Sequence, residues 1–422
     1  MMILFAWVSN VYTQDWPQYL GPDRNSKSPQ ENILRSWPEG GPEVLWTVDV
    51  GIGYGGPAIR DGRVYLLDRD DEFGDIMRCF DLNSGEEIWN FGYEAPGSVM
   101  FPGSRSVPTV DGNYVYSCGP YGDLYSMDIN THEPVWNKNV WTDFGGGEIP
   151  TWAITQCPLV YGDLLILASQ APEAGVVAYD KLTGDLVWKT PPLGPVGYVS
   201  PAIVKIDGED HLVMVTASGR GAGETGNIVG MDPLTGEIFW EYSNWKCRIP
   251  VPSAVDAGDN RIIVLGGYEL GAVMLKVEKK PDGSYVTTEL IRTEEFGDQT
   301  KPPILHNGYF YAQYGTNNTR DGLTCMSMDG EIMWKTKRDP DFNKGSMILA
   351  DGLILATDGA ESLYLIEPDP SGFKPLESAK MLTTATGDNS RAGTQNWAPI
   401  ALADGKLLIR DQSRMYCVKV AE

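Results

Sequence analysis

Aromatic, basic and amide side chains recur just after segments that end in a Trp-bearing strand pattern. A loop that repeats in this way brings its side chains together when the units are arranged around one axis, and a concave site with a few convergent polar groups is the usual form of a ligand site. The candidate residues are Tyr54, Arg105, Trp152, Tyr198, Lys246, Arg248, Lys301, Lys344, Arg391, Asn396 and Trp397.

This set of residue types suits acidic sugars. Aromatic rings and amides bind sugar rings, and we expect Trp152, Lys344, Asn396 and Trp397 to serve this purpose. A cation neutralises a uronate carboxylate and stabilises an enolate-like transition state, while a base removes the neighbouring proton. The predicted reaction is therefore a β-elimination that cleaves a glycosidic bond or removes water.

The roles divide between two groups of side chains. Arg105, Arg248 or Arg391 is predicted to face the carboxylate. The predicted base is a Tyr or a desolvated Lys, because a buried lysine loses its proton more readily. The candidates for the base are Tyr54, Tyr198, Lys246 and Lys301.

Other site chemistries find little support. The three histidines, His132, His211 and His306, fall in turns expected at the face opposite the candidate loops, and HExxH, EF-hand and phosphate-loop patterns are lacking. The six cysteines occur singly and read as small buried residues. We therefore expect no metal and no cofactor at the site.

A repeated sequence motif indicates which structural elements hold these loops. Asp180 to Trp188 has the pattern Asp-x-x-Thr-Gly-x-x-x-Trp, and the same spacing returns from Asp81 to Trp89, Asp128 to Trp136 and Asp232 to Trp240. Each phrase joins two alternating apolar runs, so it predicts an antiparallel turn in which Asp bonds its own backbone and Gly adopts a left-handed conformation. The Trp is expected to cover the seam between neighbouring units.

A second phrase, a Pro followed by a Gly-containing hairpin, begins each unit. Its copies start at Pro57, Pro108, Pro158, Pro201, Pro252, Pro303, Met347 and Pro399. The last unit is one strand short, and the isolated strand pattern at 44–49 would complete it and remove the exposed sheet edges. The sequence thus predicts an all-β, eight-bladed β-propeller over 43–422, with seven blades as the alternative because units five and seven are degenerate.

Two segments precede the propeller. Residues 1–14 resemble the hydrophobic part of a signal peptide, which predicts a periplasmic or secreted protein. Residues 15–42 are rich in Pro and Gly and are expected to form an irregular strap on the repeat surface. A net charge of −24 argues against nucleic-acid partners, no run is long enough to span a membrane, and we expect a monomer.

The Asp-to-Trp phrase resembles the pyrroloquinoline-quinone-like repeat, which quinoprotein dehydrogenases share with the outer-membrane assembly lipoprotein BamB. The resemblance implies the fold over about 43–422 but leaves the activity open. A quinone-dependent dehydrogenase using pyrroloquinoline quinone with Ca²⁺ is one alternative, although the resemblance implies an adjacent cysteine pair that this chain lacks. A non-catalytic sugar- or protein-binding scaffold is another, although a lipoprotein would need a cysteine well before Cys79. The favoured hypothesis is an exported enzyme that acts on acidic oligosaccharides.

Overall fold

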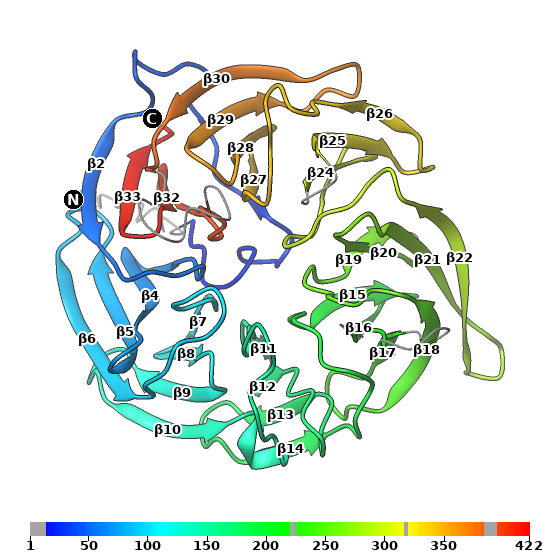
Figure 1. Cartoon of the computed structure of the whole chain (residues 1–422). Coiled ribbons are helices and arrows are strands. Elements are labelled where there is room, and N and C mark those ends of the chain that lie inside the picture. The colour runs from blue at the N-terminus through cyan, green and yellow to red at the C-terminus, as the bar shows by residue number, and fades with distance from the viewer. Residues whose placement is uncertain (1–13, 220–223, 225, 316–319, 384–394) are drawn as a thin grey trace, which may run out of the picture.

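Eight four-stranded antiparallel blades surround a central axis in the computed structural model (Figure 1). The structure describes residues 14–219, 224, 226–315, 320–383 and 395–422. The predicted all-β propeller is therefore confirmed, and eight blades rather than seven are present. Within the described residues the only helical element is the short 3-10 helix η1 (Thr142–Phe144), and no helix there is long and apolar enough to cross a bilayer.

The blades follow one another along the chain, each running from its inner to its outer strand. The first four comprise β3 (Ala58–Arg60), β4 (Arg63–Asp70), β5 (Gly74–Asp81), β6 (Glu87–Glu94); β7 (Thr109–Asp111), β8 (Tyr114–Cys118), β9 (Asp123–Asp128), β10 (Pro134–Asn139); β11 (Leu159–Tyr161), β12 (Leu164–Leu167), β13 (Val177–Asp180), β14 (Leu186–Lys189); and β15 (Ala202–Ile206), β16 (Glu209–Val215), β17 (Gly226–Met231), β18 (Ile238–Trp245).

The second half of the ring continues in the same order. Its blades comprise β19 (Val255–Gly258), β20 (Arg261–Gly266), β21 (Gly271–Lys279), β22 (Tyr285–Thr293); β23 (Ile304–His306), β24 (Tyr309–Gly315), β25 (Arg320–Ser327), β26 (Ile332–Lys335); β27 (Met347–Ala350), β28 (Leu353–Thr357), β29 (Ser362–Glu367), β30 (Lys374–Lys380); and β31 (Ala401–Ala403), β32 (Lys406–Arg410), β33 (Arg414–Lys419) with β2 (Val44–Asp49).

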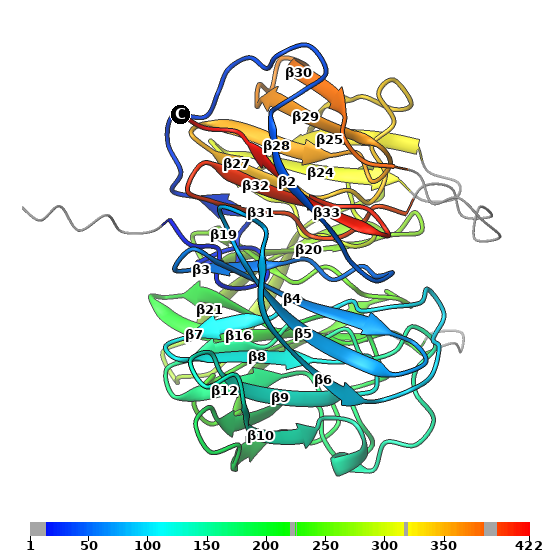
Figure 2. The same ribbon diagram turned by 90° about the vertical axis from the view of Figure 1, so that its left-hand side faces the viewer.

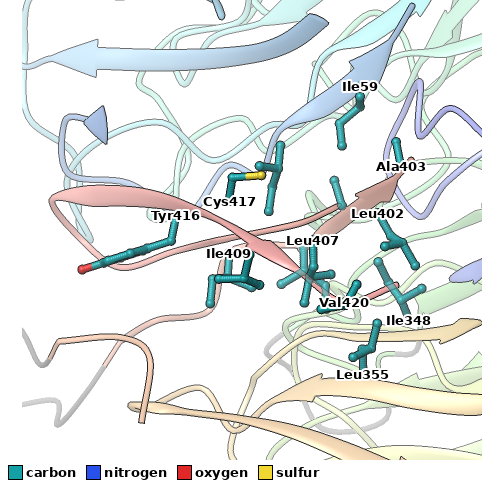
Figure 3. Packing of buried hydrophobic residues seen from close by; sticks show 14 of the residues in the cluster. Ile59, Ile348, Leu355, Leu402, Ala403, Leu407, Ile409, Tyr416, Cys417 and Val420 are labelled. Atoms are coloured by element: carbon teal, nitrogen blue, oxygen red, sulfur yellow. The ribbon is translucent and has the colours of Figure 1, made fainter. Parts of the chain in front are cut away.

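The ring closes through β2, as predicted from the missing last strand. This N-terminal strand pairs antiparallel with β33, with Thr47 opposite Tyr416 (Figure 2). The eighth blade then packs between its neighbours, and Figure 3 shows Leu402 and Leu407 between Ile59 of the first blade and Ile348 of the seventh. The two ends of the chain are thus held together in one hydrophobic core.

The Asp-to-Trp turns have the predicted geometry. Asp180 Oδ1 accepts hydrogen bonds from the backbone N–H groups of Leu182 and Thr183, both at 2.9 Å, and Gly184 has a φ of 74°. These backbone hydrogen bonds lower the pKa of the Asp180 carboxyl. The equivalent turns at Asp81, Asp128 and Asp232 bond in the same way.

Several Trp residues of the repeat pack across the seam onto the turn of the following blade, whereas Trp240 donates to His211 within its own blade. The ring of Trp136 leaves only 2.7 Å for a Cβ at Gly184, and its Nε1 donates to the carbonyl of Lys181. Trp46 makes the same contacts with Gly85 and Leu82. The turn glycine is therefore needed both for its left-handed backbone and for the space that the indole occupies.

Within a blade, the same Trp lies opposite a small residue. Cys79 pairs with Trp89, Cys325 with Trp334 and Cys417 with Trp46 across the outer strand pair. All six cysteines are buried and free. Their burial agrees with the interpretation as small packing residues.

We expect Trp46→Ala to lower the free energy of unfolding by about 3–5 kcal/mol, because it removes a buried indole at the point of ring closure. The urea midpoint followed by far-UV circular dichroism measures this. Val44→Ala is the matched control, since Val44 lies on the same strand with its side chain exposed. Equal midpoints for the two variants would contradict the closure role of Trp46.

Candidate functional site

A central cavity of about 410 Å³ lies on the propeller axis. The segment preceding the inner strand of every blade contributes to its lining, as does Tyr268 between β20 and β21. The predicted convergence of these loops is therefore present in the structure. The lining consists of Tyr19, Tyr54, Phe101, Arg105, Trp152, Thr155, Cys157, Tyr198, Ser200, Ile249, Val251, Tyr268, Gln299, Thr300, Lys301, Lys344, Trp397 and Pro399.

Trp397 is the centre of an aromatic cluster on one wall. Its ring centroid lies 5.4 Å from that of Tyr54 and 5.8 Å from that of Phe101. The Tyr54 hydroxyl donates to Gln395 Oε1, and burial raises the pKa of Tyr54 to about 12. A second pair, Trp152 and Tyr198, meets edge to face at 5.4 Å. Flat apolar rings on two walls suit the faces of sugar rings.

Arg105 brings a guanidinium to the cavity. It donates to the backbone carbonyls of Trp152, at 2.6 Å, and of Phe101, while its Nε is buried without a hydrogen-bond partner among the described residues. Burial lowers the pKa of Arg105 to about 10, so the group stays cationic at neutral pH. Because its bonds go to neutral carbonyls, its charge is not neutralised by them.

Lys301 is the second cation and the most strongly perturbed amine. Its Nζ donates to the Trp397 carbonyl at 2.9 Å. Burial lowers the pKa of Lys301 to about 8, against the opposing charge of Asp298. Asp298 is itself buried, accepts hydrogen bonds from the Thr300 and Lys301 N–H groups, and has its pKa raised by burial to about 6. A group that is part amine and part ammonium near pH 8 is suited to proton transfer.

Lys344 is the third cation. Its Nζ lies 4.6 Å from the Trp397 ring centroid, in cation–π contact, and burial lowers its pKa. Its φ is 62°, and Phe101 and Tyr268, with φ of 61° and 57°, share this left-handed backbone. Such conformations cost about 1–3 kcal/mol each and persist only where the surroundings impose them.

Among the described residues, three of the predicted ones do not line the cavity. Lys246 and Arg248 are exposed, and Lys246 lies in a separate peripheral pocket with Arg292 and Glu294. The side chains of Trp245 and Cys247, at alternate positions, are buried and so turn these charges outward. Asn396 is buried and donates to the carbonyls of Ala360 and Thr383, which gives it a structural contact rather than a place in the lining. Arg391 lies outside the described residues.

Charged residues near the loops that join the two middle strands of a blade mostly stabilise the fold. Arg69 is fully buried, pairs with Asp75 at 2.8 Å and caps two carbonyls, while Arg410 donates to the carbonyls of Gly51 and Gly55 and so ties the last blade to the first. His211, which was expected in a turn, is buried on β16 and accepts a hydrogen bond from Trp240. None of the three histidines lines the cavity.

The sequence patterns missed several lining residues. Phe101, Gln299 and Thr300 belong to loops that were already identified, and the position of each next to a predicted residue was the available signal. Tyr19 had no such signal, because it lies in the aperiodic strap.

Comparison with known proteins gives relatives by fold. The family model described as outer membrane protein assembly factor BamB matches residues 72–248. No curated protein sequence matches the chain. Among similar solved structures, a europium-containing methanol dehydrogenase has 12% sequence identity and a TM-score of 0.69, and the match covers 96% of this chain and 98% of that one. Quinohemoprotein alcohol dehydrogenase from Comamonas testosteroni has 13% identity and a TM-score of 0.66, with 97% of this chain and 81% of that one covered. BamB from Moraxella catarrhalis has 12% identity and a TM-score of 0.57, with 90% of this chain and 99% of that one covered.

These matches agree with the pyrroloquinoline-quinone-like repeat and with the fold. The identities are too low to transfer an activity, since one fold hosts many functions. The chain therefore has the pyrroloquinoline-quinone-like β-propeller fold, with a BamB-like repeat over residues 72–248.

Proposed function

We propose that the protein is an exported enzyme that binds an acidic, uronate-containing oligosaccharide in the central cavity and acts on it by β-elimination, as a dehydratase or a lyase. One observation carries the proposal. Arg105, Lys301 and Lys344 line one aromatic cavity of a protein with a net charge of −24, and none of them has a carboxylate ion-pair partner within the described part of the chain.

Cations that lack an ion-pair partner in a concave cavity favour an anionic ligand. Many other lysines and arginines of this acidic protein pair with carboxylates, as Lys335 does with Asp321 and Glu295. The three cavity cations instead bond to carbonyls or to a ring, which leaves a local positive field for a carboxylate. The aromatic walls then supply contact area for the sugar rings.

The directions of the pKa shifts support the following proton-transfer roles. Lys301, with its pKa lowered to about 8, is the base that removes the proton next to the substrate carboxylate. The electron pair of the broken C–H bond forms the new double bond, and the C–O bond to the leaving group breaks. Burial raises the pKa values of Tyr54 and Tyr198, so both phenols keep their protons. They therefore suit proton donation to the departing oxygen, whereas the sequence had suggested them as possible bases.

The quinone-dependent alternative would require ligands for Ca²⁺ at the cavity. Ca²⁺ takes six to eight oxygen ligands, usually with several carboxylates. The described cavity lining contains no Asp or Glu, and the described residues contain no cluster of three His, Cys, Asp or Glu side chains that could hold a metal. The described residues of the cavity do not fit a calcium-bound quinone.

We expect Lys301→Arg to reduce turnover about 10²–10⁴-fold, because guanidinium keeps the charge but cannot accept a proton. Mass spectrometry of acidic oligosaccharides before and after incubation measures loss of water or cleavage with a new unsaturated end. In the unmodified protein kcat/KM should rise with pH through about 8, as Lys301 loses its proton. Lys246→Arg, outside the cavity, is the control and should be fully active. Unchanged masses over a broad substrate panel would refute the reaction and leave a binding scaffold.

We expect Lys344→Gln to weaken binding of a uronate oligosaccharide about tenfold, because it removes a cation from the anion-binding wall. Isothermal titration calorimetry measures the change, which should shrink as salt screens the charge. Lys374→Gln is the matched control, since Lys374 is surface-exposed and paired with Asp369 on the seventh blade. Equal affinities for the two variants would remove Lys344 from the ligand site.

A further inference from the structure

The N-terminal strap crosses the base of the central cavity. The backbone of Trp16 exchanges hydrogen bonds of 2.9 and 2.8 Å with Ile59 of the first blade, and the Pro17 carbonyl accepts from Val110 of the second. Figure 1 shows this dark-blue segment in the middle of the ring. The part of the strap that crosses the ring ends at β1 (Lys27–Ser28), which pairs in parallel with β27.

The crossing follows a diameter of the ring. Arg24 donates from its guanidinium to the carbonyls of Pro158, at 3.1 Å, and Cys157 in the third blade. Two residues later the Ser26 carbonyl accepts from Leu349 in the seventh blade, which stands opposite the third in a ring of eight. The strap is therefore anchored on both sides of the axis.

The crossing segment is closely packed. Trp16 is 2% exposed, and a Cβ at Gly21, whose φ is 83°, would lie 2.7 Å from its ring. Tyr19 and Leu20 are buried, and the Arg24 guanidinium lies 5.8 Å from the Tyr19 ring centroid. Tyr19 is also the one strap residue that lines the cavity. Its ring thus belongs to the cavity floor.

A polymer chain cannot pass through a cavity that is closed at one end. Its volume of about 410 Å³ lies at the lower end of the roughly 300–1,000 Å³ that small-molecule sites occupy. A polymer bound by its middle needs an open cleft or a channel with two exits, and the strap closes one face of this channel. Tyr268, which lines the cavity between β20 and β21, is 48% exposed. The remaining access to the cavity is therefore from the face that carries the loop of Tyr268.

We propose that the protein takes the end of an acidic oligosaccharide chain into this blind cavity, and that Tyr19 is the specificity-determining residue that stops the chain beyond its terminal ring. The ligand class rests on the function proposed above. The mode of binding rests independently on the strap. An enzyme of this kind modifies or releases terminal units and does not cut within a polymer.

Calorimetry with a galacturonate hexamer tests the binding mode without requiring turnover. Three forms are compared, namely the free hexamer, one with a bulky aromatic label at its reducing end and one with such a label at its non-reducing end. We expect one label to weaken binding at least tenfold and the other to change it less than twofold. If both labelled hexamers bind as well as the free one, the chain-end proposal is wrong, although the proposed reaction can still stand.

The two proposals fail differently. End-dependent binding without any change in substrate mass would overturn the elimination and support the blind cavity. A hexamer that binds in none of its forms would overturn both the ligand class and the chain-end mode.

Variants of Tyr19 assign the block to this side chain. Tyr19→Ala should restore binding of the excluded labelled hexamer to within threefold of the free hexamer, because it opens the floor. Tyr19→Phe keeps the bulk and should keep the discrimination, as should Tyr242→Ala, which removes a ring from β18 outside the cavity. Thermal midpoints close to that of the unmodified protein verify folding. Discrimination that survives in a folded Tyr19→Ala variant would overturn the role of Tyr19.

Discussion

The contact between an outer-strand Trp and the turn of the next blade is the interaction on which the ring depends. At the seams of Trp46, Trp136 and Trp188 the indole rests on a left-handed turn glycine, and Trp46 and Trp136 also donate the indole N–H to a turn carbonyl. The contact buries a large apolar area and fixes the relative rotation of two sheets at once. Where the turn glycine is replaced, as at His132, a ring stacks on Trp89 at 5.1 Å and the seam is kept. Because this contact recurs around the ring, the loops that precede the inner strands gather around one axis.

Much of the fold could be predicted from the sequence because its determinants are local. Asp, Gly and Trp sit at set spacings within nine residues, and each acts through a turn or a neighbouring strand. The count of eight followed from the hairpin phrase, which survives in the fifth and seventh blades although their outer strands lack the Trp. Closure by β2 followed from the missing strand. None of these inferences required knowledge of long-range contacts beyond those that the repeat itself implies.

The site was predictable only as far as its loops were. Seven of the eleven candidates line the cavity, since the loops that carry them lead into inner strands. Within a loop, however, the direction of a side chain depends on which neighbours are buried, and Trp245 and Cys247 take the inward positions that would have brought in Lys246 and Arg248. The place of Tyr19 in the lining could not be predicted for a different reason. Its place follows from anchors on the first, second, third and seventh blades, and such non-local contacts leave no periodic trace in the strap.

Burial at the axis gives the cavity its chemical character. Removal from water disfavours the charged form of every group, so the same environment moves the pKa of Lys301 down to about 8 and that of Tyr54 up to about 12. An amine and a phenol that would both be protonated in water are thereby separated into an available base and a retained acid. Asp298 limits the effect on Lys301, because its nearby negative charge favours the ammonium form. By closing the base of the channel the strap removes one route for water, and so the segment that shapes the cavity also sustains the desolvation on which this separation depends.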